Sequence, residues 1–126
     1  MWKVVELDSA TGTWNEHGCF ATPADCKSQV ASFASGASNV YAFWDGALPT
    51  DMTEQNRLID EIFAVNNGKI DRITIGLDVS AAQKVDALSG CPGRCFCVVA
   101  HGMRRCETYY CNANNVCAWV PCGMGC

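Results

Sequence analysis

The chain has 126 residues, of which 49% are hydrophobic and 17% are charged, and its formal net charge is −4. This length is within the range of one ordinary domain, and the composition is typical of a globular chain rather than a disordered one. Residues 1–90 carry six basic and twelve acidic side chains, whereas residues 91–126 carry three and one. Nucleic-acid-binding proteins normally have a clearly basic face, so we expect no nucleic-acid partner.

The N-terminal segment, Met1–Asp8, lacks the basic start and the long apolar run of a secretory signal. No apolar run elsewhere approaches the roughly 18 residues that cross a bilayer, so we expect no membrane span. Two origins fit these observations: a cytosolic protein with its own initiator Met1, and a secreted protein whose signal has been removed. They predict opposite states of the cysteines, because thiols stay reduced in the cytosol and pair in oxidising compartments.

The first elements expected along the chain are a hairpin and a helix. Strand-forming segments at Val4–Leu7 and from Trp14 onward flank the turn-forming sequence Ser9–Gly12. A helix start follows at Thr22–Asp25, with a hydroxyl at the cap, proline in the first helical position and an acid in the first turn. This helix is predicted to extend to about Ser35.

The middle of the chain predicts two more strands and two more helices. Residues 39–44 are rich in aromatic and β-branched residues and predict a strand. Asp51 and Glu54 have the spacing of a capping box, and the apolar residues that follow recur at helical intervals up to Asn66–Gly68. Residues 72–79 alternate between apolar and polar side chains, which predicts a strand with one buried face. A short third helix is expected over 80–90.

This order of elements predicts an α+β or mixed α/β fold, with a small sheet covered by two to three helices. Alternating strands and helices favour parallel neighbours, whereas the hairpin favours antiparallel pairing. The only plausible boundary is Ser89–Gly90. It separates a body of residues 1–90 from a Cys-rich tail of residues 91–126, which can still pack on the body.

Eight of the ten cysteines lie in the 36-residue tail, at positions Cys91, Cys95, Cys97, Cys106, Cys111, Cys117, Cys122 and Cys126. So short a segment cannot bury enough apolar surface to fold alone and needs disulfides, a metal or a partner. We expect disulfides throughout, with Cys19 and Cys26 as a separate pair and a loop-rich tail. Eight cysteines allow 105 connectivities, and the sequence does not choose among them.

Two alternatives use the tail differently. Its eight cysteines, with His101 as a nitrogen ligand, could hold zinc in a cytosolic protein, although the common C-x2-C spacing is absent. Otherwise residues 1–90 could be the leader of a precursor whose tail is a processed peptide. With oxidised cysteines favoured, we expect a secreted or extracytoplasmic protein and no cofactor.

A third alternative is a hydrolase. Asp45, Asp78 and His101 each follow a predicted strand, and parallel strands would bring them to one sheet edge. Two carboxylates and an imidazole there could hold a divalent metal or perform acid–base chemistry. Each residue also has an ordinary structural explanation, because Asp45-Gly46 is a common turn pair and Asp78 precedes a helix start.

The preferred interpretation is a disulfide-stabilised interaction module rather than an enzyme. Its partner, protein or small molecule, and its oligomeric state are not indicated by the sequence. Four tryptophans and the pair Tyr109-Tyr110 could form a binding surface, although aromatic residues in a small domain more often lie in its core.

Overall fold

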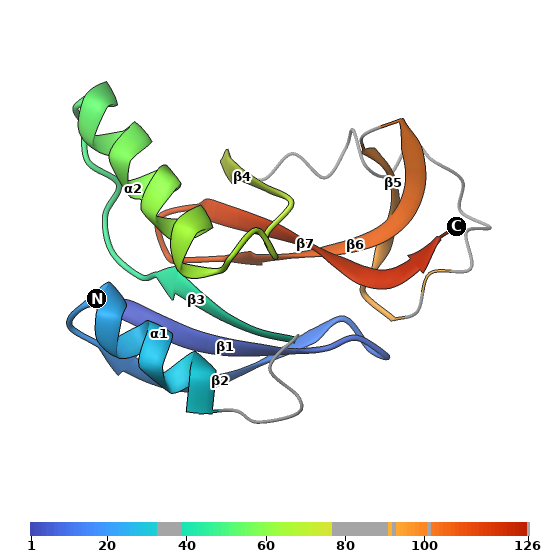
Figure 1. Ribbon diagram of the computed structural model, residues 1–126. Coiled ribbons are helices and arrows are strands. Elements are labelled where there is room, and N and C mark those ends of the chain that lie inside the picture. The colour runs from blue at the N-terminus through green and yellow to red at the C-terminus, as the bar shows by residue number, and fades with distance from the viewer. Residues whose placement is uncertain (33–38, 77–90, 92, 101, 126) are drawn as a thin grey trace.

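The structure is a computed structural model that describes residues 1–32, 39–76, 91, 93–100 and 102–125 (Figure 1). Within these ranges lie two α-helices and seven β-strands. In chain order they are β1 (Trp2–Asp8), β2 (Thr13–Phe20), α1 (Pro23–Ser32), β3 (Val40–Trp44), α2 (Met52–Val65), β4 (Arg72–Ile75), β5 (Phe96–Ala100), β6 (Met103–Cys111) and β7 (Val116–Gly125).

The strands form two sheets. The first has the order β2-β1-β3 and the second the order β4-β7-β6-β5, and every described pair of neighbours is antiparallel. The fold is therefore α+β, as expected, but with two sheets instead of one. The parallel alternative is wrong for the described strands, because the hairpin turns that join β1 to β2, β5 to β6 and β6 to β7 are too short for crossovers.

The two sheets pack face to face, and α1 lies on the opposite side of the first sheet (Figure 1). From the first sheet, Val5 and Phe43 point toward the second sheet, where they meet Tyr110 and Val120. The same core includes Ile62 of α2. Residues on both sides of position 90 thus share one core, while the division into folding units at that position stays a prediction.

Local signals in the first 66 residues predicted their elements well. The β1–β2 hairpin is confirmed, and the carbonyl oxygen of Asp8 accepts hydrogen bonds from the N–H groups of Thr11 and Gly12 across its turn. The cap of α2 is also confirmed, because the Asp51 carboxylate accepts a hydrogen bond of 3.1 Å from the N–H of Glu54. The predicted helix over 80–90 lies outside the described residues.

The strand expected directly before His101 is present as β5, but the rest of the tail is not loop-rich as predicted, because β6 and β7 join β4 and β5 in the second sheet. Three consecutive residues of β6, Cys106, Glu107 and Thr108, are all buried, so side chains on both faces of the strand are covered there. The resulting sequence pattern does not alternate between apolar and polar residues, which is why it gives a weak strand signal.

Glu107 is stabilised by charge pairing. It accepts hydrogen bonds from Arg72 Nη1 (2.5 Å) and Arg105 Nε (2.6 Å), and both arginines also pair with the largely buried Asp71. Two arginines thus neutralise two carboxylates, which offsets the cost of taking these charges out of water. The cluster joins β6 to β4 and the residue before it.

The outer edge of β3 is covered by side chains rather than by another strand. The amide of Asn66, at the end of α2, donates to the carbonyl oxygen of Ala42 (2.7 Å) and accepts from its N–H (2.8 Å). Lys69 and Asn112 donate to the carbonyl oxygens two residues before and two residues after Ala42. An edge whose backbone groups are occupied in this way is closed to pairing with another chain.

Disulfides cross-link the second sheet and the segment before it. Three are described: Cys91–Cys106, Cys95–Cys122 and Cys111–Cys117. The last closes the β6–β7 hairpin, and the second ties the start of β5 to β7. Cys97 is also disulfide-bonded. The expected disulfide-stabilised tail is confirmed for these residues.

The predicted pairing of Cys26 with Cys19 stays a prediction. The Cys26 side chain, in the first turn of α1, is fully buried in the core. A cysteine side chain in such surroundings packs as a small apolar group.

Candidate functional site

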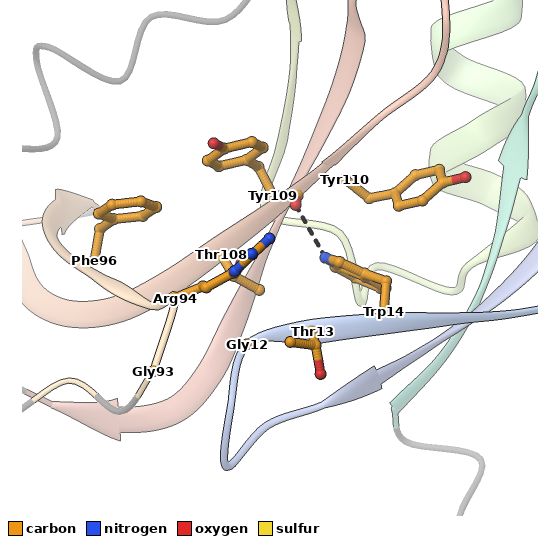
Figure 2. Close-up of a pocket in the computed structure, with 9 residues that line it drawn as sticks. All are labelled: Gly12, Thr13, Trp14, Gly93, Arg94, Phe96, Thr108, Tyr109 and Tyr110. Atoms are coloured by element: carbon orange, nitrogen blue, oxygen red, sulfur yellow. Dashed lines mark hydrogen bonds between the residues drawn. The ribbon is translucent and has the colours of Figure 1, made fainter.

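A cleft of about 690 Å³ lies at one end of the two sheets (Figure 2). This volume is typical of small-molecule sites. The lining residues come from the β1–β2 turn, the segment before β5, β5 itself and β6: Gly12, Thr13, Trp14, Gly93, Arg94, Phe96, Thr108, Tyr109 and Tyr110.

Two glycines allow the two turns that form one wall of the cleft to approach each other closely. The N–H of Arg94 donates a 2.8 Å hydrogen bond to the carbonyl oxygen of Thr11, which fixes the segment before β5 against the β1–β2 turn. A Cβ on Gly93 would lie 2.0 Å from that oxygen, and a Cβ on Gly12 would lie 3.0 Å from the Arg94 backbone. Both glycines also have positive φ angles, +48° and +72°. A larger residue at either position would separate the two turns.

Four of the nine lining residues are aromatic. Phe96 and Tyr109 stack with their ring centroids 5.9 Å apart and their planes 11° apart. Trp14 meets Tyr110 edge to face at 5.5 Å, and its indole N–H donates to the carbonyl oxygen of Tyr109 (3.0 Å), as Figure 2 shows. This hydrogen bond links the two sheets. All four of these residues are only partly buried.

The hydroxyl of Tyr110 is held by charged groups of the first sheet. It donates a 2.8 Å hydrogen bond to Glu16 Oε1, and Lys3 Nζ lies 3.1 Å from the same oxygen. Burial, followed by the hydrogen bond to Glu16, raises the pKa of Tyr110 to about 12. The hydroxyl is therefore neutral at physiological pH and serves to position the ring.

Arg94 provides the positive charge of the cleft. Its side chain is exposed and points from the Gly93-Arg94 turn into the cleft, between Phe96 and Trp14 in the view of Figure 2. Within the part of the chain that the structure describes, its guanidinium forms no hydrogen bond or ion pair. Among the lining residues that the structure describes there is no carboxylate.

The residues of the hydrolase alternative are not brought together by the described strands. Asp45 lies at the end of β3 in the first sheet, where its carboxylate is 3.2 Å from Lys3 Nζ. The strands expected to carry Asp78 and His101, β4 and β5, form the two opposite edges of the second sheet. Asp78 and His101 themselves lie outside the described residues. The shared edge of parallel strands, on which that alternative depended, is absent from the described sheets.

The zinc alternative loses most of its ligands. Seven of its cysteines are disulfide-bonded, and a disulfide sulfur cannot act as a thiolate ligand. Among the described residues, no group of three or more His, Cys, Asp or Glu side chains could hold a metal ion.

The sequence analysis named three of the residues that line the cleft. Trp14, Tyr109 and Tyr110 were among the aromatic residues considered as a binding surface, whereas Trp2 and Trp119 are buried. Arg94 and Phe96 were missed as site residues, as were the two glycines. The only local signal for them is Pro92-Gly93, a turn dipeptide between two cysteines.

These features define a small, disulfide-stabilised α+β module with an aromatic cleft. None of the helices in the described ranges is long and apolar enough to cross a membrane. Comparisons of the chain with protein-family models, with curated proteins and with solved structures found no match.

Proposed function

We propose that the protein is a binding module whose ligand inserts a flat, apolar group into the aromatic cleft. The observation that carries this proposal is the set of four partly exposed rings, from Trp14, Phe96, Tyr109 and Tyr110, around one cavity. Ring faces left open to solvent contribute little to folding, but they provide large contact areas for a ligand.

The rigidity of the walls supports this function. The stacked pair Phe96 and Tyr109 belongs to the disulfide-linked second sheet, and Trp14 is fixed by its hydrogen bond to that sheet. A preformed site loses little conformational entropy when a ligand binds.

The disulfides favour an oxidising compartment, so we place the working protein outside the cytosol. The processed-peptide alternative is less well supported. Val116, Ala118 and Val120 of the tail are buried in the main core, and release of the tail would expose them together with their partners.

The test uses 2-naphthamide, an uncharged flat probe, titrated into the ¹⁵N-labelled protein. We expect NMR shift changes at the Trp14 indole N–H and at the backbone amides of Gly12 and Gly93. The Trp44 indole, which donates to Ala47 outside the cleft, should not shift. Absence of shifts at the cleft signals at millimolar probe, or equal shifts at Trp44, would refute the proposal.

A pair of variants tests the contribution of the rings. Phe96→Leu keeps an apolar side chain but removes the stacked ring, and we expect it to weaken probe binding by about two- to tenfold. Phe63→Leu, in α2 and outside the cleft, is the matched control and should leave binding unchanged. Equal effects of the two substitutions would mean that the rings act through stability alone.

A further inference from the structure

Most polar groups that line the cleft already form hydrogen bonds within the protein. The indole N–H of Trp14 binds the carbonyl oxygen of Tyr109, and the hydroxyl of Tyr110 binds Glu16. The hydroxyl of Thr13 pairs with that of Thr11 at 2.7 Å, and Thr108 is only 2% exposed. A ligand that depends on many hydrogen bonds, such as a neutral sugar, would find few partners here.

Arg94 is the exception. Its guanidinium has five N–H donors, none of them used within the described structure, and it stands beside open ring faces. The contact of Arg94 with the β1–β2 turn is made by its backbone N–H, which donates to Thr11, and does not involve the side chain. A planar guanidinium matches a carboxylate in two parallel hydrogen bonds and also stacks on aromatic groups.

We infer that the ligand is a small aromatic carboxylate, with its ring against the aromatic walls and its carboxylate on the Arg94 guanidinium. This inference rests on the proposed binding function and adds the chemical class of the ligand. The described lining residues include no carboxylate, which suits an anion, because an acid beside it would repel it. The protein as a whole is acidic, so the attraction is local to Arg94 rather than long-range.

The test compares two probes of nearly equal shape, 2-naphthoate and 2-naphthamide, by the same NMR signals. We expect 2-naphthoate to bind about three- to tenfold more tightly. Arg94→Met retains the backbone contact and much of the side-chain length, and it should remove this preference without weakening 2-naphthamide. Arg94→Lys should retain part of it, because the charge remains while the two-pronged geometry is lost.

Arg104→Met provides the matched control, since Arg104 is an exposed arginine of β6 that does not line the cleft. It should leave the preference for 2-naphthoate intact. Binding of both probes with equal affinity, or loss of the preference in Arg104→Met as well, would overturn the assignment to Arg94 while leaving the cleft as a binding site. Binding of neither probe would instead refute the proposed function itself.

Discussion

At the scale of single residues, Asn66 shows how a polar side chain can be required in a core. It is 1% exposed, and its amide makes three hydrogen bonds, two with the backbone of Ala42 and one with the carbonyl oxygen of Ile62. Together with Lys69 and Asn112 it takes the place of a fourth strand beside β3. Removing it would leave the N–H and the carbonyl of Ala42 buried without these partners.

We therefore expect Asn66→Ala to lower the free energy of unfolding by about 2–4 kcal/mol, because each buried group left without a partner costs roughly 1–3 kcal/mol. Urea denaturation followed by circular dichroism measures this change. Asn56→Ala, on the exposed surface of α2, is the control and should be neutral or slightly stabilising, since alanine favours helix. A loss below 1 kcal/mol in Asn66→Ala would mean that water replaces the amide at this edge.

At the scale of elements, prediction succeeded where the signal is local. The cap formed by Asp51, and the turn at Ser9–Gly12, each depend on a few adjacent residues. The strands of the tail depend on partners instead, and Glu107, which looks like a surface residue in the sequence, is buried by Arg72 of β4. The cleft likewise depends on contacts between segments that are far apart in the sequence. Contact between Gly93 and the β1–β2 turn joins distant parts of the chain, and no local pattern encodes it.

The tail strands give a prediction at this scale. A fragment that ends at Gly90 loses β7 and with it Val116, Ala118 and Val120 from the main core. Each buried valine contributes about 1.5–3 kcal/mol, and the total stability of a domain is only about 5–15 kcal/mol. We expect this fragment to lack a cooperative thermal transition by circular dichroism, whereas the full chain has one. A cooperative transition in the fragment would show that residues 1–90 fold independently.

At the scale of the whole molecule, the two sheets are stabilised by different means. The first sheet lies between α1 and the second sheet and relies on buried apolar side chains such as Val4 and Phe43. The described disulfides all lie in the second sheet or in the segment before it. That sheet and the segment before it supply six of the nine lining residues of the cleft, so the cross-links act where a binding site needs fixed walls.

Reduction should therefore unfold the protein and close the cleft to ligands. The bridges Cys91–Cys106 and Cys95–Cys122 span 15 and 27 residues, and the chain-entropy estimate for loops of this size is about 3 kcal/mol each. Their sum is comparable with the whole stability of a small domain. With a phosphine reductant, we expect the melting transition to fall by tens of degrees and the Trp14 indole shift with 2-naphthamide to disappear.

A metal chelator under non-reducing conditions should change neither the melting transition nor this shift, because the cysteines are bonded to each other. Sensitivity to the chelator, together with full alkylation of the unfolded chain by iodoacetamide, would instead establish a zinc protein with reduced thiols.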